Sequence, residues 1–348
     1  MKKIILLATL ITSFSAAYSQ YFTVKLGGGY SWGGMQQSTG VMTFQPGAST
    51  DPAYAQIIPL VAFSTAASDS PSQKYKSNVY AAYGQGGHFD FSFGYMINPY
   101  FGIQLDGAYL WGHTISAEQL YDAPGLLGPG TKITTSTYSN GLSINPSLYL
   151  RAAKPTAKFA PYARLGIALP IAGAIYHKLN IQAPNSVLGN ITSSEIDVKT
   201  EANLSVGVQG SVGVSYTPFP LMTFSAELGG QYLIVRAKQS TLTAYTLNVQ
   251  GSAQQNLLST LTNYSRVTNY VDQLNTSNNA EDFGKARDIS GAHNGQAAYV
   301  DERKSHDVLR QVANLANFGI SVNVSFNLSK NILKDPFGKK AKAAAAKN

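Results

Sequence analysis

The chain has 348 residues, no cysteine and a formal net charge of +8 at pH 7. This length allows one to three domains, and because no break in composition divides the chain, we expect one domain with large insertions. The absence of cysteine excludes a disulfide framework and a lipid anchor on an N-terminal cysteine.

Residues 1–19 have the pattern of a secretory signal peptide. Lys2 and Lys3 precede an apolar run, and the small residues Ala17 and Ser19 stand where a cleavage site requires them. No other segment reaches the roughly 18 uncharged apolar residues that a membrane-spanning helix needs. An exported chain without such a helix is either soluble or a membrane barrel.

Most of the positive charge lies at the two ends of the chain. Lys2 and Lys3 belong to the predicted signal peptide, and residues 329–348 hold six lysines against one aspartate, so the rest is nearly neutral. This Lys/Ala-rich tail lacks the aromatic residues of a nucleic-acid surface, and we expect no nucleic-acid partner. A solvated tail is the simpler interpretation; contact with an anionic envelope polymer or lipid headgroup is the alternative.

Eight segments alternate apolar and polar residues with a period of two, as β-strands do. In segment 101–113, aromatic and aliphatic side chains share one face, and Gln104 and Asp106 lie on the other. In a soluble sandwich the apolar face packs on a second sheet, whereas in a membrane barrel it faces lipid and the polar face lines the lumen. The segments are approximately 21–32, 88–97, 101–113, 140–152, 160–178, 201–216, 221–237 and 316–328.

The connections between these segments alternate between short and long. Each short connection contains proline, which cannot donate to a strand ladder; they lie near 98–100, 153–159 and 217–220. The long connections lie near 33–87, 114–139, 179–200 and 238–315. Within the last of these, Val308, Val312 and Leu315 have helical spacing, so we expect a short amphipathic helix over residues 301–317.

Short turns at one rim and long loops at the other, with an even strand number, are typical of bacterial outer-membrane barrels. We therefore predict an all-β fold, an eight-stranded antiparallel up-and-down transmembrane barrel over residues 20–328. Its turns would be periplasmic, its long surface loops 33–87 and 238–315 extracellular, and residues 329–348 a periplasmic tail. A soluble exported sandwich is the alternative fold.

The stretch from Gly87 to Gly112, with its Gly-Tyr-turn-Gly hairpin around Asn98-Pro99-Tyr100, resembles the second hairpin of the outer-membrane beta-barrel domain family, a porin family similar to the small OmpA and OmpX barrels. The resemblance implies a place in the outer membrane, contact with its lipid and lipopolysaccharide, and assembly by the barrel insertion machinery. It departs from the family at the C-terminus, because the last predicted strand, ending at Leu328, is followed by twenty more residues.

Few ionisable side chains fall on the predicted lumen face, three basic and three acidic. Since an eight-stranded barrel has an interior that side chains fill, these charges would form a mutually neutralising network. The alternative is a narrow gated pathway in which rearranged ion pairs admit water and small ions. The six residues are Lys25, Asp90, Asp106, Arg151, Arg164 and Glu227.

Candidate catalytic residues are few. The five histidines have no metal-ligand spacing, so we expect no metal and no cofactor. Residues 125–132 fail as a phosphate-binding loop because the spacing is wrong and no helix pattern follows. His113 and His177 stand near outer strand ends, with Ser116 and Asp122 near the first, which leaves a rim enzyme acting on membrane lipid as a minor alternative.

Three functions therefore remain open. The leading hypothesis is an outer-membrane barrel, not an enzyme, with a structural or small-pore, porin-like role. The second is a surface binding or adhesion protein that uses its long loops, because loops on a rigid scaffold often carry binding residues. The third is the rim enzyme.

Overall fold

The computed structural model describes most of the expected barrel and part of its connections. The predicted signal peptide 1–19 and the tail 329–348 lie outside the described residues. The described residues are 21–34, 37–38, 41–42, 63–64, 80–81, 83–121, 131–154, 157–182, 184, 191–259, 265–280, 286–288, 299–301, 303–310 and 312–328.

Eight antiparallel strands close into a barrel, which confirms the predicted fold class. In chain order each strand pairs with the next, and the last pairs with the first from Phe22↔Leu328 to Gly33↔Asn317. The eight are β1 (Tyr21–Gly33), β6 (Gly86–Met96), β7 (Phe101–Gly112), β9 (Thr131–Arg151), β10 (Phe159–Gln182), β12 (Gly207–Phe219), β13 (Met222–Tyr232) and β21 (Asn317–Leu328).

The period-two pattern places apolar side chains outside and polar ones inside. In β7, Ile103 and Leu105 on the outer face are each 47% exposed, whereas Asp106 on the lumen face is only 6% exposed. In β21, Val322 is 63% exposed and its neighbour Asn323 only 1%. Such an inverted distribution suits a barrel surrounded by lipid, because the apolar outer face needs no second sheet to cover it.

Aromatic side chains pair near both ends of the barrel strands. Phe159 stacks on Tyr216 at a centroid distance of 4.8 Å beside the short turns, and Trp32 stacks on Phe318 at 5.8 Å near the opposite ends of β1 and β21. Amphipathic rings favour the two membrane interfaces. No helix in the described part of the chain is long and apolar enough to cross a membrane.

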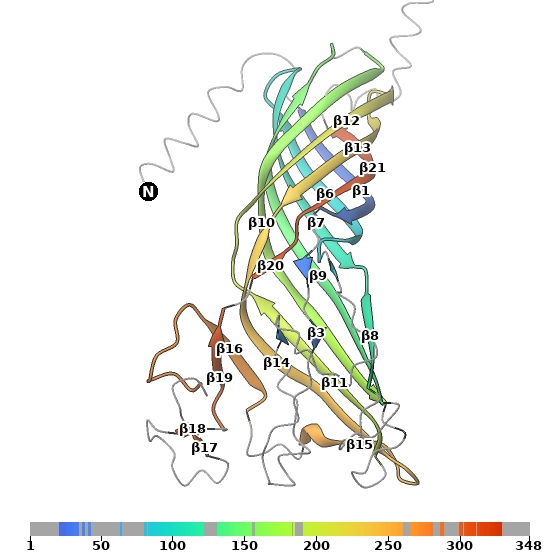
Figure 1. The fold of residues 1–348 in the computed structure, drawn as a ribbon. Helices are drawn as coiled ribbons and strands as arrows, with labels where there is room; N and C mark the ends of the chain where they lie inside the picture. The colour runs from blue at the N-terminus through green and yellow to red at the C-terminus, as the bar shows by residue number, and fades with distance from the viewer. Residues whose placement is uncertain are drawn as a thin grey trace, which may run out of the picture.

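Beyond the barrel, β9 and β10 continue into an open part of the same sheet, which we call the outer sheet (Figure 1). It comprises residues 131–139 and 174–182 of these two strands together with β8 (Ile115–Tyr121), β11 (Ile191–Ala202) and β14 (Ile234–Val249). The expected loops 114–139 and 179–200, and the start of 238–315, are thus largely strand. Their Ser- and Thr-rich sequences hide the alternation, because both faces of these strands carry polar side chains.

The expected helix over residues 301–317 is wrong, because the described residues there form short strands. Residues Thr268–Val271 pair in parallel with residues 306–309, a long-range contact that overrides the local helical spacing. The shorter elements are β2 (Gln37–Ser38), β3 (Val41–Met42), β4 (Phe63–Ser64), β5 (Tyr80–Ala81), β15 (Gln255–Asn256), the 3₁₀ turn η2 (Leu257–Ser259), β16 (Val267–Val271), β17 (Ala286–Asp288), β18 (Tyr299–Asp301), β19 (His306–Leu309) and β20 (Val312–Asn314).

A β-bulge in β10 marks the boundary between barrel and outer sheet. Pairing with β9 shifts register between Pro170 and Ala172, which leaves Ile171 as the extra residue. An extra residue inverts the alternation of side chains. Leu165, before the bulge, is therefore 66% exposed, whereas Leu179, an even number of residues later, is only 4% exposed.

Candidate functional site

Four charged side chains from four different strands meet inside the barrel. Lys25 of β1 lies 3.2 Å from a carboxylate oxygen of Glu227 of β13 and 3.8 Å from Asp106 of β7. Arg164 of β10 donates to the same two carboxylates, to Asp106 at 2.8 Å and to Glu227. The four groups thus form a closed ring of alternating sign, which we call the charge cluster.

Neutral side chains complete the hydrogen bonding of the charge cluster. Glu227, only 3% exposed, accepts hydrogen bonds from the Tyr162 hydroxyl at 2.7 Å and the Asn323 amide at 3.2 Å. Ser147 donates to Asp106 at 2.8 Å. Each carboxylate therefore has both ionic and neutral donors, the condition under which buried charges are tolerated.

A glycine makes room for one of these donors. A Cβ atom on Gly213 would lie 2.7 Å from the Tyr162 ring, closer than such contacts occur. Since Gly213 pairs directly with Glu227 on β13 and with Tyr162 on β10, its missing side chain lets the phenol cross the strand and reach the carboxylate. A larger residue at this position would displace Tyr162.

The charge cluster joins strands from around the barrel across its lumen. Its side chains are 2–15% exposed, and positive and negative charges are equal in number. An eight-stranded barrel is narrow enough for side chains to fill its interior. At this level the interior of the barrel therefore holds a buried, neutral and hydrogen-bonded set of side chains.

The structure does not bring Asp90 and Arg151, the other two predicted lumen charges, into the charge cluster. Asp90 lies 3.3 Å from His88 Nε2, and His88 Nδ1 is 3.2 Å from the Ser31 hydroxyl. Arg151 donates to the carbonyl of Ala157 at 3.4 Å, beside a short turn. Height along the tilted strands separates these residues, and alternation alone carries no information on height.

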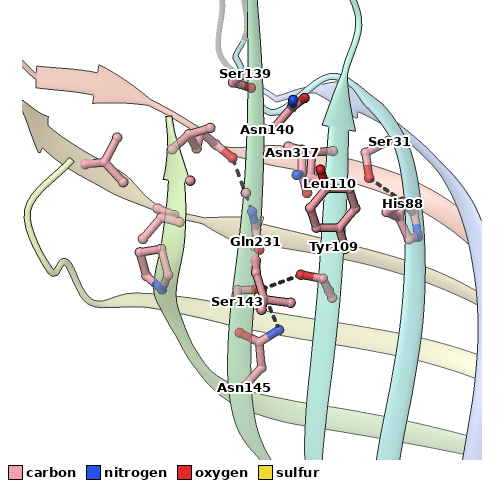
Figure 2. A pocket seen from close by; sticks show the side chains of 18 of the residues that line it. Ser31, His88, Tyr109, Leu110, Ser139, Asn140, Ser143, Asn145, Gln231 and Asn317 are labelled. Atoms are coloured by element: carbon pink, nitrogen blue, oxygen red, sulfur yellow. Dashed lines mark hydrogen bonds between the residues drawn. The ribbon is translucent and has the colours of Figure 1, made fainter. Parts of the chain in front are cut away.

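A cavity of about 690 Å³ lies on the outer side of the charge cluster. Arg164 and Glu227 line its inner end, and residues of the outer sheet such as Lys199 line its other end. Figure 2 shows hydroxyl and amide side chains along its wall, with the Asn145 amide donating to Ser143 at 3.2 Å and Ser31 bonded to His88. The cavity can therefore hydrogen-bond a polar ligand.

Sequence reasoning missed several of these residues. Tyr162 and Asn323 share the inward parity of the predicted charges, and that signal alone could have found them. His88 stands two residues before Asp90 on one strand face, so its pairing with Asp90 was also readable. The cavity itself has no comparable signal, because its walls come from strands far apart in sequence.

The candidate rim residues do not form one site. His113 is exposed, whereas His177 is 7% exposed and its ring lies 3.1 Å from the Thr137 hydroxyl. Ser116 shares a hydrogen bond with Ser136, and Asp122 lies outside the described residues. Across the described segments, no three His, Cys, Asp or Glu side chains group closely enough to hold a metal ion.

The sequence over residues 4–254 matches the family described as outer membrane protein beta-barrel domain. The chain belongs to this family. The match runs from before β1 into the residues after β14, and β21, which closes the barrel, lies beyond it. Family membership places the protein in the outer membrane, with its apolar barrel face in contact with lipid.

Comparison with curated proteins gives no significant match for this outer-membrane barrel. Among solved structures it is similar to the crystal structure of Ail, the attachment invasion locus protein of Yersinia pestis, in complex with the heparin analogue sucrose octasulfate. The two chains share 7% identity, and the alignment covers 89% of this chain and all of Ail at a TM-score of 0.25.

Proposed function

We propose that this outer-membrane barrel does not conduct and that it binds ligands at the cell surface through the outer sheet and the cavity at its base. The charge cluster carries this proposal, because it seals the lumen while leaving a polar cavity open on the outer side. Adhesion or binding, the alternative in the sequence analysis, is therefore favoured over a porin-like role. We propose no enzymatic activity.

The outer sheet supports a binding role. Its strands present hydroxyl and amide side chains, and Tyr138 and Tyr176 stack at a centroid distance of 4.9 Å on neighbouring strands. Aromatic faces beside hydroxyl donors suit hydroxyl-rich ligands such as neutral polysaccharide, because they combine apolar contact with hydrogen bonding. A rigid sheet also holds such groups at fixed positions.

A small gated pore is the second candidate. Arg164 is the most exposed member of the charge cluster, at 15%, and it lines the cavity. Swinging its guanidinium toward the cavity would break two ion pairs and admit water. Such a pore would leave two buried carboxylates, Asp106 and Glu227, to share Lys25 as their one remaining cation in the charge cluster.

Planar bilayers separate the two candidates. The mature chain, beginning near Gln20, should give no steady conductance steps, and steady steps in the unaltered protein would overturn the proposal in favour of the pore. An array of neutral and sulfated polysaccharides then tests binding. We expect retention on neutral polysaccharides that is lost when Tyr138 and Tyr176 are both replaced by serine; equal retention by this variant would contradict the proposed surface.

The remaining features belong to the same proposal. Residues 1–19 would be removed on export, and residues 20–328 would be inserted by the barrel insertion machinery into a lipopolysaccharide-bearing membrane. Of the six predicted lumen charges, the four in the charge cluster would block the lumen. Residues 329–348 would remain in the periplasm. Mass spectrometry of the protein purified from outer membranes tests the cleavage: a chain that still carries residues 1–19 would contradict it.

A further inference from the structure

The wall of the barrel is interrupted between β10 and β12. Their pairing ends at Ala168↔Gly207, and β10 pairs with β11 only from Ala174↔Glu201 onward. Across this interval, residues 169, 170, 172 and 173 have ladder partners on β9 alone, and Ile171 is the extra residue of the bulge. The segment that leads into β12 turns away from β10, because the backbone N–H of Asn203 donates to the carbonyl of Arg236 on β14 at 2.8 Å.

On the outer face of the barrel, apolar side chains lie beside the interruption. Leu204 and Val206, 77% and 69% exposed, continue the apolar stripe that Val208 and Val212 form on the outside of β12. On the other side, Ile171 is 51% exposed. Apolar side chains therefore flank the interruption on both sides, as they do where the wall is fully paired.

The backbone at the interruption is unusual for a membrane strand. Residues 171–173 are exposed in succession, which breaks the alternation, and Gly173 has a φ of +149° that favours glycine. Unpaired backbone at membrane depth is tolerated where it lines a water-filled cavity. The 690 Å³ cavity provides space for water there, because Pro170, Ile171 and Leu204 are among the residues that line it.

We propose that the cavity opens sideways through this interruption and takes an amphiphile from the membrane, with its hydrocarbon chain between Ile171 and Leu204 and an uncharged, hydroxyl-bearing head inside. This site is additional to the proposed function. It rests on that proposal, because the charge cluster would have to block the lumen below the cavity. The chain would remain in contact with the apolar stripe, while only the head leaves the lipid.

The lining of the cavity selects the head group. Three cationic and three anionic side chains line it, so it has no net charge to attract an ion; they are Arg164, Lys199, Lys238, Asp90, Glu201 and Glu227. Asn145 is 2% exposed, and its side-chain oxygen has no hydrogen-bond partner among the described residues. This oxygen is itself buried, so the head group would meet the accessible hydroxyl and amide groups of the wall, such as those of Ser143 and Gln231, which suit a hydroxyl-bearing head.

Photolabelling in vesicles tests the opening. The probe is a monoacylglycerol with a diazirine on its glycerol head, incorporated into phosphatidylcholine vesicles that hold the full-length mature barrel. We expect cross-links on lumen residues of β9 and β13, including Asn145 and Gln231, that unlabelled monoacylglycerol suppresses. Cross-links confined to outward-facing residues would overturn the proposal.

Two matched variants locate the path. Ala172→Trp places a large ring at the interruption and should lower lumen labelling about tenfold. Val212→Trp puts the same ring on the outward face of β12 where it pairs with Ala163, and labelling should not change. Equal labelling in both variants would contradict sideways access. Heat-modifiable migration on gels confirms that each variant forms a barrel.

Competition tests the head group, and conductance separates this site from the proposed function. Lysophosphatidic acid, with the same chain and an anionic head, should compete at least about tenfold more weakly than monoacylglycerol; equal competition would overturn the assignment of an uncharged head. If the barrel does not conduct and shows no lumen cross-links, this site is refuted and the proposed function stands. If the barrel conducts, the proposal that the charge cluster blocks the lumen is refuted, and this site is refuted with it.

Discussion

The barrel and the outer sheet share the strands β9 and β10 but use their side chains in opposite ways. In the barrel, apolar residues such as Leu165 and Ile167 face outward and polar residues fill the interior. In the outer sheet, Leu179, Ile196 and Tyr245 form one row across β10, β11 and β14, and each is at most 4% exposed. The two parts of these strands thus suit different surroundings, lipid around the barrel and water around the outer sheet. The extra residue Ile171 inverts the alternation of apolar and polar side chains between the two parts of β10.

Removing one carboxylate from the charge cluster should have the largest effect. Glu227→Ala leaves Lys25 and Arg164 buried with one counterion between them, and we expect a loss of about 3–5 kcal/mol in the free energy of unfolding. Urea titration of the refolded barrel in detergent measures it. Glu201→Ala is the control in the outer sheet: its exposed pair with Lys199 should contribute less than about 1 kcal/mol. Equal losses would show that burial does not distinguish the two regions.

A charge on the outward face tests the lipid contact. Val322→Arg should lower barrel stability in vesicles by about 2–4 kcal/mol if the residue lies near the membrane midplane, because the guanidinium must leave water. Equilibrium unfolding from vesicles gives the value. In a soluble sandwich Val322 would be buried against protein, so a chain that folds in aqueous buffer without lipid or detergent, and that V322R unfolds there, would contradict the assignment of this face to lipid.

A smaller change should act on the outer sheet alone. Ile196→Val removes one methylene from a side chain that is 1% exposed and should destabilise β10, β11 and β14 locally by about 0.5–1.5 kcal/mol. Hydrogen exchange should quicken in these strands while protection in β1 and β21 stays unchanged. Faster exchange throughout the barrel would mean that the two regions unfold as one unit.

Acid should weaken the outer sheet before the barrel. Burial lowers the pKa of His177, in the part of β10 that pairs with β11 beyond the membrane, to about 4. Below about pH 6.5 the His177 imidazole binds a proton in the unfolded outer sheet but stays neutral in the folded one. The free energy of unfolding of the outer sheet therefore falls between about pH 6.5 and pH 4. Exchange protection of β10 and β11, compared at pH 7 and pH 5 after correction for intrinsic rates, should show this loss, and His177→Asn should abolish the difference.

The barrel was readable from sequence because lipid and lumen impose strict alternation on each strand, as segment 101–113 shows. The outer sheet was not: Thr134, Thr135 and Ser136 carry hydroxyls on both faces, so strand and loop look alike. The helical spacing of Val308 and Val312 was overridden by strand pairing, parallel with β16 for Val308 and antiparallel with β14 for Val312, which no local pattern reveals.

The charged residues show the same limit. Inward parity identified all four members of the charge cluster, because each is an ionisable residue on a strand whose outer face is apolar. Parity could not separate them from Asp90 and Arg151, because height in the lumen depends on strand tilt and stagger. The cavity depends further on where β10 changes partners, which a single sequence does not encode in any simple period.

Closure of the barrel also constrains the order of folding. The pairing Phe22↔Leu328 joins residues about 300 positions apart, and contacts of such separation form late because the intervening chain must first lose its freedom. Lys25 and Asp106 lie on β1 and β7, which both pair with β6, so their contact does not need the last strand. Glu227 lies across the closing strand β21 from Lys25, so it has only Arg164 as a cation until the barrel closes, and its ion pair with Lys25 forms last.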